Sequence, residues 1–350
     1  MFWLVACGLL LELDSPSMAM RAMLLEGPRP AEQAPLRPVE RERPAPGPGE
    51  VRVQVRCCAL CHTDLHTVEG DLPLPKLPVI PGHQIVGIID AVGAGVRQRR
   101  EGDRVGIPWL HSTCGQCRYC RSGQENLCES ARFTGYHVDG GYAEAATIGE
   151  DFCYPLPGAF SDEHAAPLLC AGIIGYRSYR LSGAKSGDCL GLYGFGASAH
   201  IVLQFARHLG CQVCVFTRTA AHAALARQLG AAWVGDATQS PPSPLDAAII
   251  FAPAGSLVPE ALRVTRPGGT VACAGITMSP IPAMDYSLLY RERILRSVTN
   301  NTRQDAREFL ELAGQVPVHT EIQTFPLEKA NSALVELKHS RIAGAGVLKV

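Results

Sequence analysis

The stretch DCLGLYGFGASAHIVLQFARHLG, residues 188–210, combines a strand, a glycine-rich turn and a helix. Residues 188–194 form the short apolar run of a buried strand, and residues 197–210 have the periodicity of a helix that stops at a glycine. Such a turn places backbone N–H groups at a helix N-terminus, where the pyrophosphate of a dinucleotide binds. The stretch therefore predicts a dinucleotide-binding unit; the alternative is a glycine-rich turn in an α/β domain that binds no nucleotide.

The segments that follow repeat this alternation of strands and helices. Apolar runs at 211–217, 246–255 and 271–277 are typical of buried strands, and the segments between them have helical patterns. The segment ERILRSVTNN, residues 292–301, is a candidate for the last strand. Alternating strands and helices predict a parallel sheet covered on both faces, so residues 173–301 are expected to form a doubly wound α/β domain.

The glycine pattern departs from the usual G-x-G-x-x-G form. That form needs glycine at positions 191, 193 and 196, whereas this chain has Gly191, Tyr193 and Gly196, with Gly194 as an additional glycine. Because the middle glycine lets the backbone approach the phosphates, Tyr193 is a substantive departure. We nevertheless expect the whole turn to bind the cofactor: Gly191, Tyr193, Gly194, Phe195 and Gly196.

The end of the second strand bears on the choice of dinucleotide. In NAD-binding domains an acidic residue at this point holds the adenosine ribose. This chain has Thr217 and Arg218 there, and no acid. A guanidinium in place of a carboxylate favours a 2′-phosphate, so Thr217 and Arg218 are expected to bind the cofactor, and NADP is favoured over NAD.

The size and charge of the chain limit its possible functions. Its 350 residues are enough for about two domains. The formal net charge of -1 gives no electrostatic reason to expect a nucleic acid or an anionic membrane as a partner. There are 14 cysteines, several of them within apolar runs, and in a chain of this length they indicate core thiols and metal ligands in a reducing compartment. We therefore expect a cytoplasmic protein.

The first twenty residues are expected to lie outside the folded domains. FWLVACGLLLEL, residues 2–13, is apolar, but no positive charge precedes it and no clear cleavage site follows it. It is also too short to span a bilayer. An upstream start-codon assignment, with the folded protein beginning near Met20, is favoured over a targeting segment. Residues 1–20 are therefore expected to be a disordered or mis-assigned extension.

Residues 21–172 are dense in glycine, proline and valine. EVRVQVRCCAL, residues 50–60, alternates apolar and polar side chains as a half-buried strand does, and residues 84–96 and 102–107 have strand and turn patterns. We expect a mostly β domain with long loops. The chain after about residue 301 has a helical pattern and ends in AGAGVLKV, a strand expected to return residues 302–350 to this first domain.

The stretch TCGQCRYCRSGQENLC, residues 113–128, contains four cysteines in a loop-like context rich in glycine and charged residues. Four thiolates suit a closed tetrahedral zinc site. Disulfides and an iron–sulfur cluster are the alternatives, and a thioredoxin-like redox pair is expected at the start of a helix after a strand instead. We expect structural zinc in a lobe at 111–130, bound by Cys114, Cys117, Cys120 and Cys128.

A second group of possible metal ligands is spread along the chain. CALCHTDLH, residues 58–66, contains Cys61, and His83 and Cys170 follow in PGHQIVG and LLCAGIIGY. A catalytic zinc takes three protein ligands and leaves one position open, and two cysteines with one histidine are a known set. Spacing alone does not select these three residues, because a single cysteine or histidine is more often a core thiol or a surface imidazole.

Together these motifs resemble the zinc-dependent alcohol dehydrogenases of the medium-chain dehydrogenase/reductase family. The resemblance extends from about Arg21 to Val350 and rests on CHTDLH, PGH-x-IVG, GDRV, the four-cysteine stretch, GGYAE at 140–144 and the glycine loop. It implies a GroES-like catalytic domain joined to a Rossmann domain. It also implies two zinc ions per chain, a nicotinamide cofactor, and a homodimer or homotetramer.

The resemblance assigns roles to individual residues. Cys61, His83 and Cys170 match the ligands of the catalytic zinc, and the four-cysteine stretch matches the structural zinc lobe. Thr63 matches the hydroxyl that bonds the substrate oxygen, and His66 matches the end of the proton relay to solvent.

Further residues follow from the same resemblance. His62 matches a basic contact to the pyrophosphate, Asp64 a carboxylate that orients a zinc ligand, and Trp109 an aromatic residue of the substrate pocket. Gln84 departs from the family, which usually has glutamate after the zinc-binding histidine. A carboxylate there assists ligand exchange, so its absence bears on turnover.

The expected function is hydride transfer between a primary alcohol or aldehyde and NAD(P), with zinc as the Lewis acid. A related dehydrogenase acting on a polyol, a cinnamyl-type aldehyde or a thiol adduct is the first alternative. A catalytically silent nicotinamide-binding protein is the second, although the intact Cys61, His83, Cys170, Thr63 and His66 argue against it. A zinc-ribbon nucleic-acid binder would explain the four cysteines, but not the near-zero charge or the dinucleotide domain.

Overall fold

The computed structural model describes residues 19–316, 318–342 and 344–350. The expected extension of residues 1–20 lies outside the described residues, except for Ala19 and Met20, which begin a strand. None of the helices in the described ranges is long and apolar enough to cross a bilayer.

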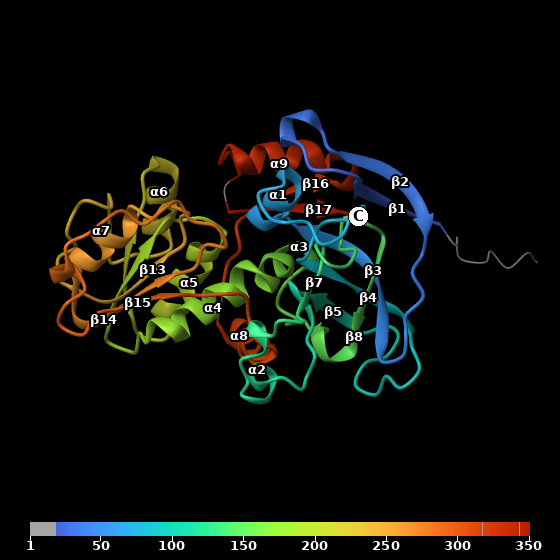
Figure 1. The fold of residues 1–350 in the computed structure, drawn as a ribbon, viewed down its shortest axis with the longest axis horizontal. Coiled ribbons are helices and arrows are strands. Elements are labelled where there is room, and N and C mark those ends of the chain that lie inside the picture. Colours follow the sequence, from blue (N-terminus) through green and yellow to red (C-terminus); the bar gives the residue numbers. More distant parts are fainter. Residues whose placement is uncertain (1–18, 317, 343) are drawn as a thin grey trace, which may run out of the picture.

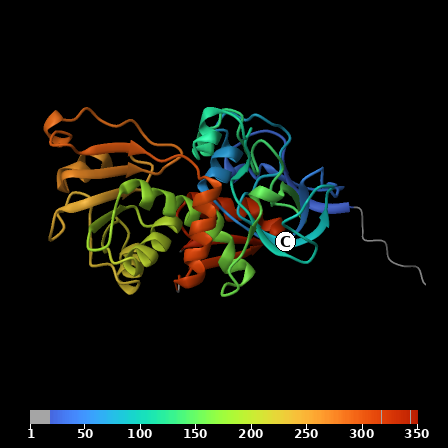
Figure 2. The same ribbon diagram turned by 90° about the horizontal axis from the view of Figure 1, so that it is seen from below.

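Two bodies lie side by side, each built on one sheet (Figures 1 and 2). Helices α4 (Ala171–Ser182) and α8 (Arg303–Gln315) lie between them and contact each other. Because α4 begins directly after Cys170, the boundary between the two bodies is also the place where one of the predicted metal ligands lies.

The body on the left in Figure 1, formed by the second domain along the chain, contains a six-stranded parallel sheet with the order β12-β11-β10-β13-β14-β15. Along the chain this corresponds to 3-2-1-4-5-6, the order of the doubly wound dinucleotide-binding fold. The prediction of a Rossmann domain is therefore confirmed. Its elements are β10 (Cys189–Tyr193), α5 (Ala197–His208), β11 (Gln212–Phe216), α6 (Ala220–Gln228), β12 (Trp233–Gly235), β13 (Leu245–Ile250), α7 (Leu257–Val264), β14 (Thr265–Cys273), the 3-10 turn η5 (Tyr286–Leu288) and β15 (Ile294–Ser297).

Strand β10 is buried along its whole length because helices cover both faces of the sheet. Its side chains alternate between two cores. Leu190 and Leu192 pack in the cluster that includes α4 and α5, whereas Cys189 and Tyr193 pack in the cluster that includes α7. This alternation decides where the side chain of Tyr193 points.

The other body, formed by the N-terminal domain and the last strands, contains a mostly antiparallel seven-stranded sheet in the order β16-β17-β3-β4-β5-β9, with β8 paired to β3. The expected GroES-like, mostly β domain is confirmed. Strand β17 pairs antiparallel with β3, with Val347 opposite Ala59, so this late strand lies inside the sheet, between β16 and β3. The strands are β3 (Glu50–Ala59), β4 (Ile85–Val92), β5 (Arg104–Ile107), β8 (Ala145–Gly149), β9 (Tyr154–Pro155), β16 (Ile322–Pro326) and β17 (Ala345–Lys349).

Smaller elements surround this sheet. Two short two-stranded sheets are formed by β1 with β2 and by β6 with β7. The remaining elements are β1 (Ala19–Leu25), η1 (Ala31–Gln33), β2 (Leu36–Glu42), α1 (His62–Glu69), β6 (Leu110–Ser112), α2 (Arg118–Arg121), η2 (Glu125–Leu127), β7 (Arg132–Phe133), η3 (Glu150–Phe152), α3 (Asp162–Ala165), η4 (Ala166–Leu169), η6 (Leu327–Lys329) and α9 (Ala330–Lys338).

Helices α4 and α8 are joined through the buried carboxylate of Asp305. It accepts hydrogen bonds from the Thr302 backbone N–H at 2.8 Å and hydroxyl at 2.7 Å, which caps the start of α8. Arg177 and Arg180 of α4 donate to the same carboxylate at 2.7 and 2.8 Å. Since every oxygen of this buried group has a charged or capping donor, the two helices are held in a fixed relation.

A buried histidine lies next to the glycine turn. His200 of α5 is 1% exposed, its Nδ1 lies 3.3 Å from the Gly196 carbonyl oxygen, and its Nε2 has no hydrogen-bond partner among the described residues. Burial lowers the pKa of His200 to about 4, so the ring is neutral at physiological pH.

This histidine is expected to destabilise the fold as the pH falls. His200 has the ordinary pKa in the unfolded chain and the lowered pKa in the folded chain. Its contribution to the free energy of unfolding is therefore complete above about pH 6.5 and is lost as the pH falls toward about 4. When the pH falls from about 7 to about 5, the titration of His200 should lower the free energy of unfolding by about 2 kcal/mol. Urea unfolding at both pH values should show that His200→Gln loses less stability than the wild type. Equal losses would contradict the assignment, because the protonation of metal ligands affects both proteins alike.

Candidate active site and cysteine lobe

Three residues distant in sequence meet where the two bodies join. Cys61 precedes α1, His83 lies in the loop before β4, and Cys170 precedes α4. Their ligand atoms all lie within 4.8 Å of one another, and the two sulfurs are 3.9 Å apart. The structure thus brings together the three residues that the sequence singled out as ligands of a catalytic zinc.

Asp64 holds two members of this cluster in place. One oxygen of its buried carboxylate accepts a hydrogen bond from the Cys61 backbone N–H at 2.9 Å. In return, the Cys61 sulfur accepts from the backbone N–H of Asp64, the third residue of α1, and the two bonds form a capping box. The other oxygen lies 2.8 Å from His83 Nδ1. Tyr142 donates its hydroxyl to Asp64 at 3.2 Å. The Nδ1–H of His83 is thereby directed to the carboxylate, which leaves Nε2 for a ligand.

The cluster has the composition and dimensions of a zinc site. His83 Nε2 is buried and has no hydrogen-bond partner among the described residues. Two sulfurs bound to one tetrahedral zinc lie about 3.8 Å apart, close to the 3.9 Å between Cys61 and Cys170. A disulfide needs about 2 Å. Two thiols and an unpaired imidazole nitrogen therefore fit a metal ion, with a fourth position left for another ligand.

The protonation of the cluster also favours metal binding. The hydrogen bond from Cys170 holds the pKa of Cys61 well below its ordinary value, so one sulfur is a thiolate. Burial lowers the pKa of His83, but the charge of Asp64 outweighs it and raises the pKa to about 10. A cation at this point replaces the proton that the cluster otherwise retains.

The predicted relay residues lie on one side of the cluster. Thr63 is buried, with its hydroxyl 3.6 Å from the Cys61 sulfur. His66 Nδ1 lies 2.8 Å from the Asp71 carboxylate, and His66 Nε2 lies 3.3 Å from the Thr277 hydroxyl. In the described ranges of the chain no hydrogen bond joins Thr63 to His66. Asp71 and Thr277 were not found from the sequence, and Thr277 is 211 positions from His66.

Aromatic rings form a wall beside the cluster. The Trp109 ring meets the edge of His83 at 4.8 Å between centroids. Phe133 stacks on Trp109 at 5.0 Å, and Tyr136 lies at 5.7 Å from Trp109 and donates its hydroxyl to the Pro73 carbonyl oxygen. Gln84, the residue after His83, is buried and donates its amide to the Leu60 carbonyl oxygen at 3.1 Å. Its side-chain oxygen has no partner within the described ranges.

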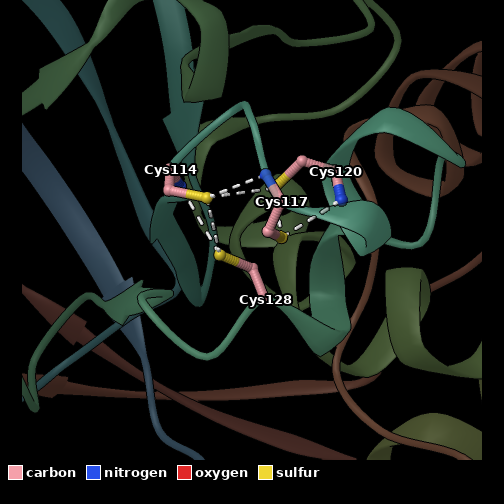
Figure 3. Close-up of side chains that lie close together, drawn as sticks. All are labelled: Cys114, Cys117, Cys120 and Cys128. Carbon is pink, nitrogen blue, oxygen red and sulfur yellow. Dashed lines mark hydrogen bonds between the residues drawn. The ribbon is translucent and has the colours of Figure 1, made fainter.

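The four cysteines of the lobe converge on one point (Figure 3). Cys114 lies 3.5 Å from Cys128 and 3.9 Å from Cys120, and Cys117 lies 3.5 Å from Cys120, each measured between sulfurs. These separations match the edges of a tetrahedron around zinc, which are about 3.8 Å. The 13 described cysteines are free thiols, so the disulfide alternative finds no support there.

The lobe backbone prepares these sulfurs for a cation. The Cys117 backbone N–H points at the Cys114 sulfur at 3.3 Å, and the Cys120 N–H points at the Cys117 sulfur at 3.5 Å. Backbone N–H groups of Gln116 and Cys117 lower the pKa of Cys114 to about 6. A loop that donates hydrogen bonds to sulfur stabilises the thiolate form that zinc requires.

The glycine turn leaves space at the start of α5. Gly194 has φ +86°, and a Cβ there would lie 2.9 Å from that of Ala252. Gly196 is the N-cap position of α5 and has open space in front of it, and within residues 19–316, 318–342 and 344–350 no side chain caps the helix. An uncapped N-terminus with room in front fits a pyrophosphate. Gly191, by contrast, lies inside β10 beneath Leu245.

Two residues predicted to bind the cofactor turn their side chains elsewhere. Tyr193 stacks on Phe216 with centroids 4.0 Å apart, and Phe195 is 3% exposed in the core shared with α5. The reason is the alternation along β10, which points position 193 into the core against α7 rather than toward the turn. Only the backbone of these residues remains available to a cofactor, and the missing middle glycine does not obstruct the turn.

The remaining predicted cofactor residues are accessible. His62 is exposed at the first position of α1, and Thr217 and Arg218 directly follow β11. The sequence shows no acid after β11, but the structure brings Asp236, which follows β12, near Arg218. Hydrogen bonds from Thr238 and the charge of Arg218 hold the pKa of Asp236 below its usual value. Arg218 therefore has an acidic neighbour that sequence reasoning missed.

Comparison with known proteins covers nearly the whole chain. The alcohol dehydrogenase GroES-like domain model matches residues 47–158, and the zinc-binding dehydrogenase model matches residues 199–315. The probable alcohol dehydrogenase AdhA of Mycobacterium tuberculosis (strain CDC 1551 / Oshkosh) is 49% identical over 337 residues, covering 95% of this chain and 97% of that protein. An alcohol dehydrogenase of Geobacillus stearothermophilus is 40% identical over 327 residues, covering 90% and 96%. A cinnamyl alcohol dehydrogenase structure from Sorghum bicolor has a TM-score of 0.85 at 25% identity, covering 95% of this chain and 97% of that one.

Proposed function

The chain belongs to the zinc-binding alcohol dehydrogenases of the medium-chain dehydrogenase/reductase family, and we propose that it transfers hydride between a primary alcohol or its aldehyde and NADP. The enzyme class, an oxidoreductase that uses zinc and a nicotinamide cofactor, follows from the family. The observation that carries the site assignment is the cluster of Cys61, His83 and Cys170 at the junction of the two bodies.

In this proposal Cys61, His83 and Cys170 hold the catalytic zinc. Zinc bound there polarises the substrate oxygen as a Lewis acid. Asp64 fixes the ring orientation of His83 and holds its Nδ1–H, so Nε2 is the nitrogen that faces the metal and gives up its proton when the metal binds. The aromatic wall around Trp109 covers one side of the cluster and orients the carbon chain of the substrate.

Thr63 and His66 are the two ends of the proposed proton relay, and a water or a cofactor hydroxyl would carry the proton between them, because no hydrogen bond joins the two among the described residues. The Thr63 hydroxyl, beside the Cys61 sulfur, donates to and accepts from the substrate oxygen. His66 then exchanges the proton through one ring nitrogen while Asp71, half exposed at the surface, bonds the other. Thr277, in the cofactor domain, hydrogen-bonds to His66, so the relay depends on the relative position of the two domains.

The turn before α5 would hold the pyrophosphate of the cofactor, and the nicotinamide ring would exchange hydride with the substrate beside the cluster of Cys61, His83 and Cys170. The uncapped helix start receives the pyrophosphate, and His62 lies on the catalytic side as a basic partner. Exposed Arg218 supports the choice of NADP, since a guanidinium pairs well with a 2′-phosphate. The carboxylate of Asp236 competes with a 2′-phosphate for Arg218, which reduces the expected preference for NADP.

The choice of cofactor can be tested with reduced NADP and reduced NAD in parallel, across aliphatic, benzyl and cinnamyl-type aldehydes. We expect turnover with kcat/KM at least about tenfold higher for NADPH, and Arg218→Gln should remove about that factor for NADPH while leaving NADH unchanged. Asp236→Asn is the matched variant, expected to strengthen NADPH use. A preference for NADH in the wild type would refute the role of Arg218 without affecting the enzyme class.

A second substrate class is favoured by one observation. Trp109, Phe133 and Tyr136 form a continuous aromatic surface beside His83, which suits a planar ring such as that of a cinnamyl-type aldehyde. The same aldehyde panel separates this class from the aliphatic one by kcat/KM. Absence of turnover with every aldehyde in zinc-replete protein would support the silent alternative.

We further propose that the four-cysteine lobe holds a second, structural zinc.

We also propose that the protein is a homodimer. Strand β15 lies at an edge of the cofactor sheet, and within the described part of the chain the strand and the segment before it have exposed apolar residues: Ile281, Tyr286, Tyr290 and Ile294. An unpaired edge strand flanked by exposed aromatics is a typical surface for pairing with another copy. The mass in solution distinguishes a dimer from a tetramer or a monomer.

A further inference from the structure

A buried tyrosine lies beside the turn that carries His83. The backbone N–H of Tyr142 donates to the Pro81 carbonyl oxygen at 3.0 Å, and that of Gly141 donates to the Gly82 carbonyl oxygen at 2.9 Å. The segment before β8 is thus joined to the turn before β4 by backbone hydrogen bonds, at the two residues that precede His83. Tyr142 has no part in the substrate contacts or in the relay described above.

The ring of Tyr142 packs on the backbone of this turn. Gly82 has φ +98°, in the left-handed region, and a Cβ built on it would overlap Tyr142 Cδ1. Only glycine therefore permits the ring to approach so closely. Because the two groups are in contact in a close-packed interior, the position of the ring limits how the turn that carries His83 can move.

The hydroxyl of Tyr142 is directed at the carboxylate of Asp64. Asp64 Oδ2 accepts from the Tyr142 hydroxyl at 3.2 Å and from the Cys61 backbone N–H at 2.9 Å. The other oxygen, Oδ1, lies 2.8 Å from His83 Nδ1. An ionised carboxylate only accepts hydrogen bonds, so the tyrosine is the donor. Two donors on Oδ2 fix the rotation of the carboxylate and leave Oδ1 facing His83.

Burial alone does not demand this contact. The hydroxyls of Tyr154 and Tyr193 are also buried, and neither has a hydrogen-bond partner within the described ranges. Those two rings fill the core by packing. Tyr142 differs from them because its hydroxyl reaches a carboxylate that also bonds a predicted metal ligand.

We propose that Tyr142 is a positioning residue for the metal site: its hydroxyl holds Asp64 in the orientation that bonds His83, and its ring holds the turn that carries His83. This inference rests on the proposed catalytic zinc. Groups that orient a metal ligand affect the affinity for the metal without touching it. Tyr142 acts in this way at one contact further from the ion than Asp64.

Tyr142→Phe tests the hydroxyl, because it keeps the ring and removes the donor. Zinc-loaded protein is titrated with a chromophoric chelator, and the two ions are told apart with Cys61→Ser, which should keep only the lobe zinc. We expect Tyr142→Phe to weaken binding of the catalytic zinc about tenfold and to leave the lobe zinc unchanged. With Co2+ at the catalytic site, the visible absorption should also change, because it responds to the placement of His83.

Tyr154→Phe is the matched control. It removes a buried hydroxyl from the same domain, but one that has no partner within the described ranges, so both ions should bind as in the wild type. Asp64→Asn, alone and combined with Tyr142→Phe, completes a double-mutant cycle. If the tyrosine acts through Asp64, adding Tyr142→Phe to Asp64→Asn should weaken zinc binding little further.

The outcomes separate this inference from the proposed function. Wild-type zinc affinity in Tyr142→Phe, equal weakening in Tyr154→Phe, or additive effects in the cycle would each overturn the role of Tyr142 and leave the catalytic zinc in place. A wild type that holds no more zinc than Cys61→Ser would overturn both. If Tyr142→Phe does not fold, a crystal structure of the zinc-loaded wild type decides: the Tyr142 hydroxyl must still be hydrogen-bonded to Asp64, and its displacement would exclude the role.

Discussion

Cys61→Ser is expected to abolish turnover while leaving the fold and the lobe metal intact. The cluster would lose its thiolate, and with it the zinc that stabilises charge on the substrate oxygen. Several kcal/mol of transition-state stabilisation correspond to a loss of at least about 10³-fold in kcat/KM. Metal analysis of the purified variant should show zinc falling from about two ions per chain to about one, with an unchanged circular dichroism spectrum.

A matched variant separates the metal from the thiol. Cys153→Ala removes another buried thiol of the catalytic domain that lies outside both metal clusters, so turnover and zinc content should stay near those of the wild type. Cys61→Ser with wild-type turnover would mean that the reaction does not depend on this cluster. Loss of both zinc ions would mean that the two sites are not independent.

Glu125→Ala is expected to destabilise the enzyme by about 3 kcal/mol, a Tm decrease of roughly 4 °C for a chain of this length. Glu125 is 5% exposed and accepts four hydrogen bonds from Arg303, one from its backbone N–H at 2.7 Å and the shortest guanidinium one also at 2.7 Å. Its loss leaves the first N–H of α8 unpaired and the guanidinium with only the 3.3 Å contact to Asp151 as an ion pair. The lobe would keep the hydrogen bond from Asn126 to the Thr299 carbonyl oxygen, in the segment before α8.

Glu129→Ala in the same lobe is the control, because its exposed carboxylate should contribute less than about 0.5 kcal/mol. Calorimetric unfolding of both variants in the zinc-loaded state measures the difference. Similar Tm values for the two would show that the lobe is not anchored through Glu125. A loss of lobe zinc only in Glu125→Ala would show that anchoring and metal retention are coupled.

Much of the architecture was predictable because it depends on local pattern. The turn at 191–196 and the alternation of apolar strands and helices after it identify the parallel sheet without any long-range information. The four cysteines of the lobe are close in sequence, so their spacing already indicates a closed metal site. In both cases the residues that meet in space are also neighbours in the chain.

The rest depends on contacts between distant segments. No spacing rule links Cys61, His83 and Cys170; only the resemblance to a family did so, and the structure supplies the proximity. Asp71 and Thr277 beside His66, and Asp236 beside Arg218, carry no sequence signal because exposed acids and hydroxyls are common everywhere. The direction of the Tyr193 side chain was missed because it follows from the register of β10 rather than from the glycine motif.

The pairing of β17 with β3 has a consequence for how the protein is made. The six strands of the cofactor sheet are consecutive between residues 189 and 297, so that sheet can form while later residues are still being synthesised. The catalytic sheet is completed later: β3, β4, β5, β8 and β9 lie within residues 50–155, but β17 can pair with β3 only after residues 345–349 have emerged. Until β17 arrives, residues 57–59 of β3 lack their partner strand on that side and are open to pairing with another chain.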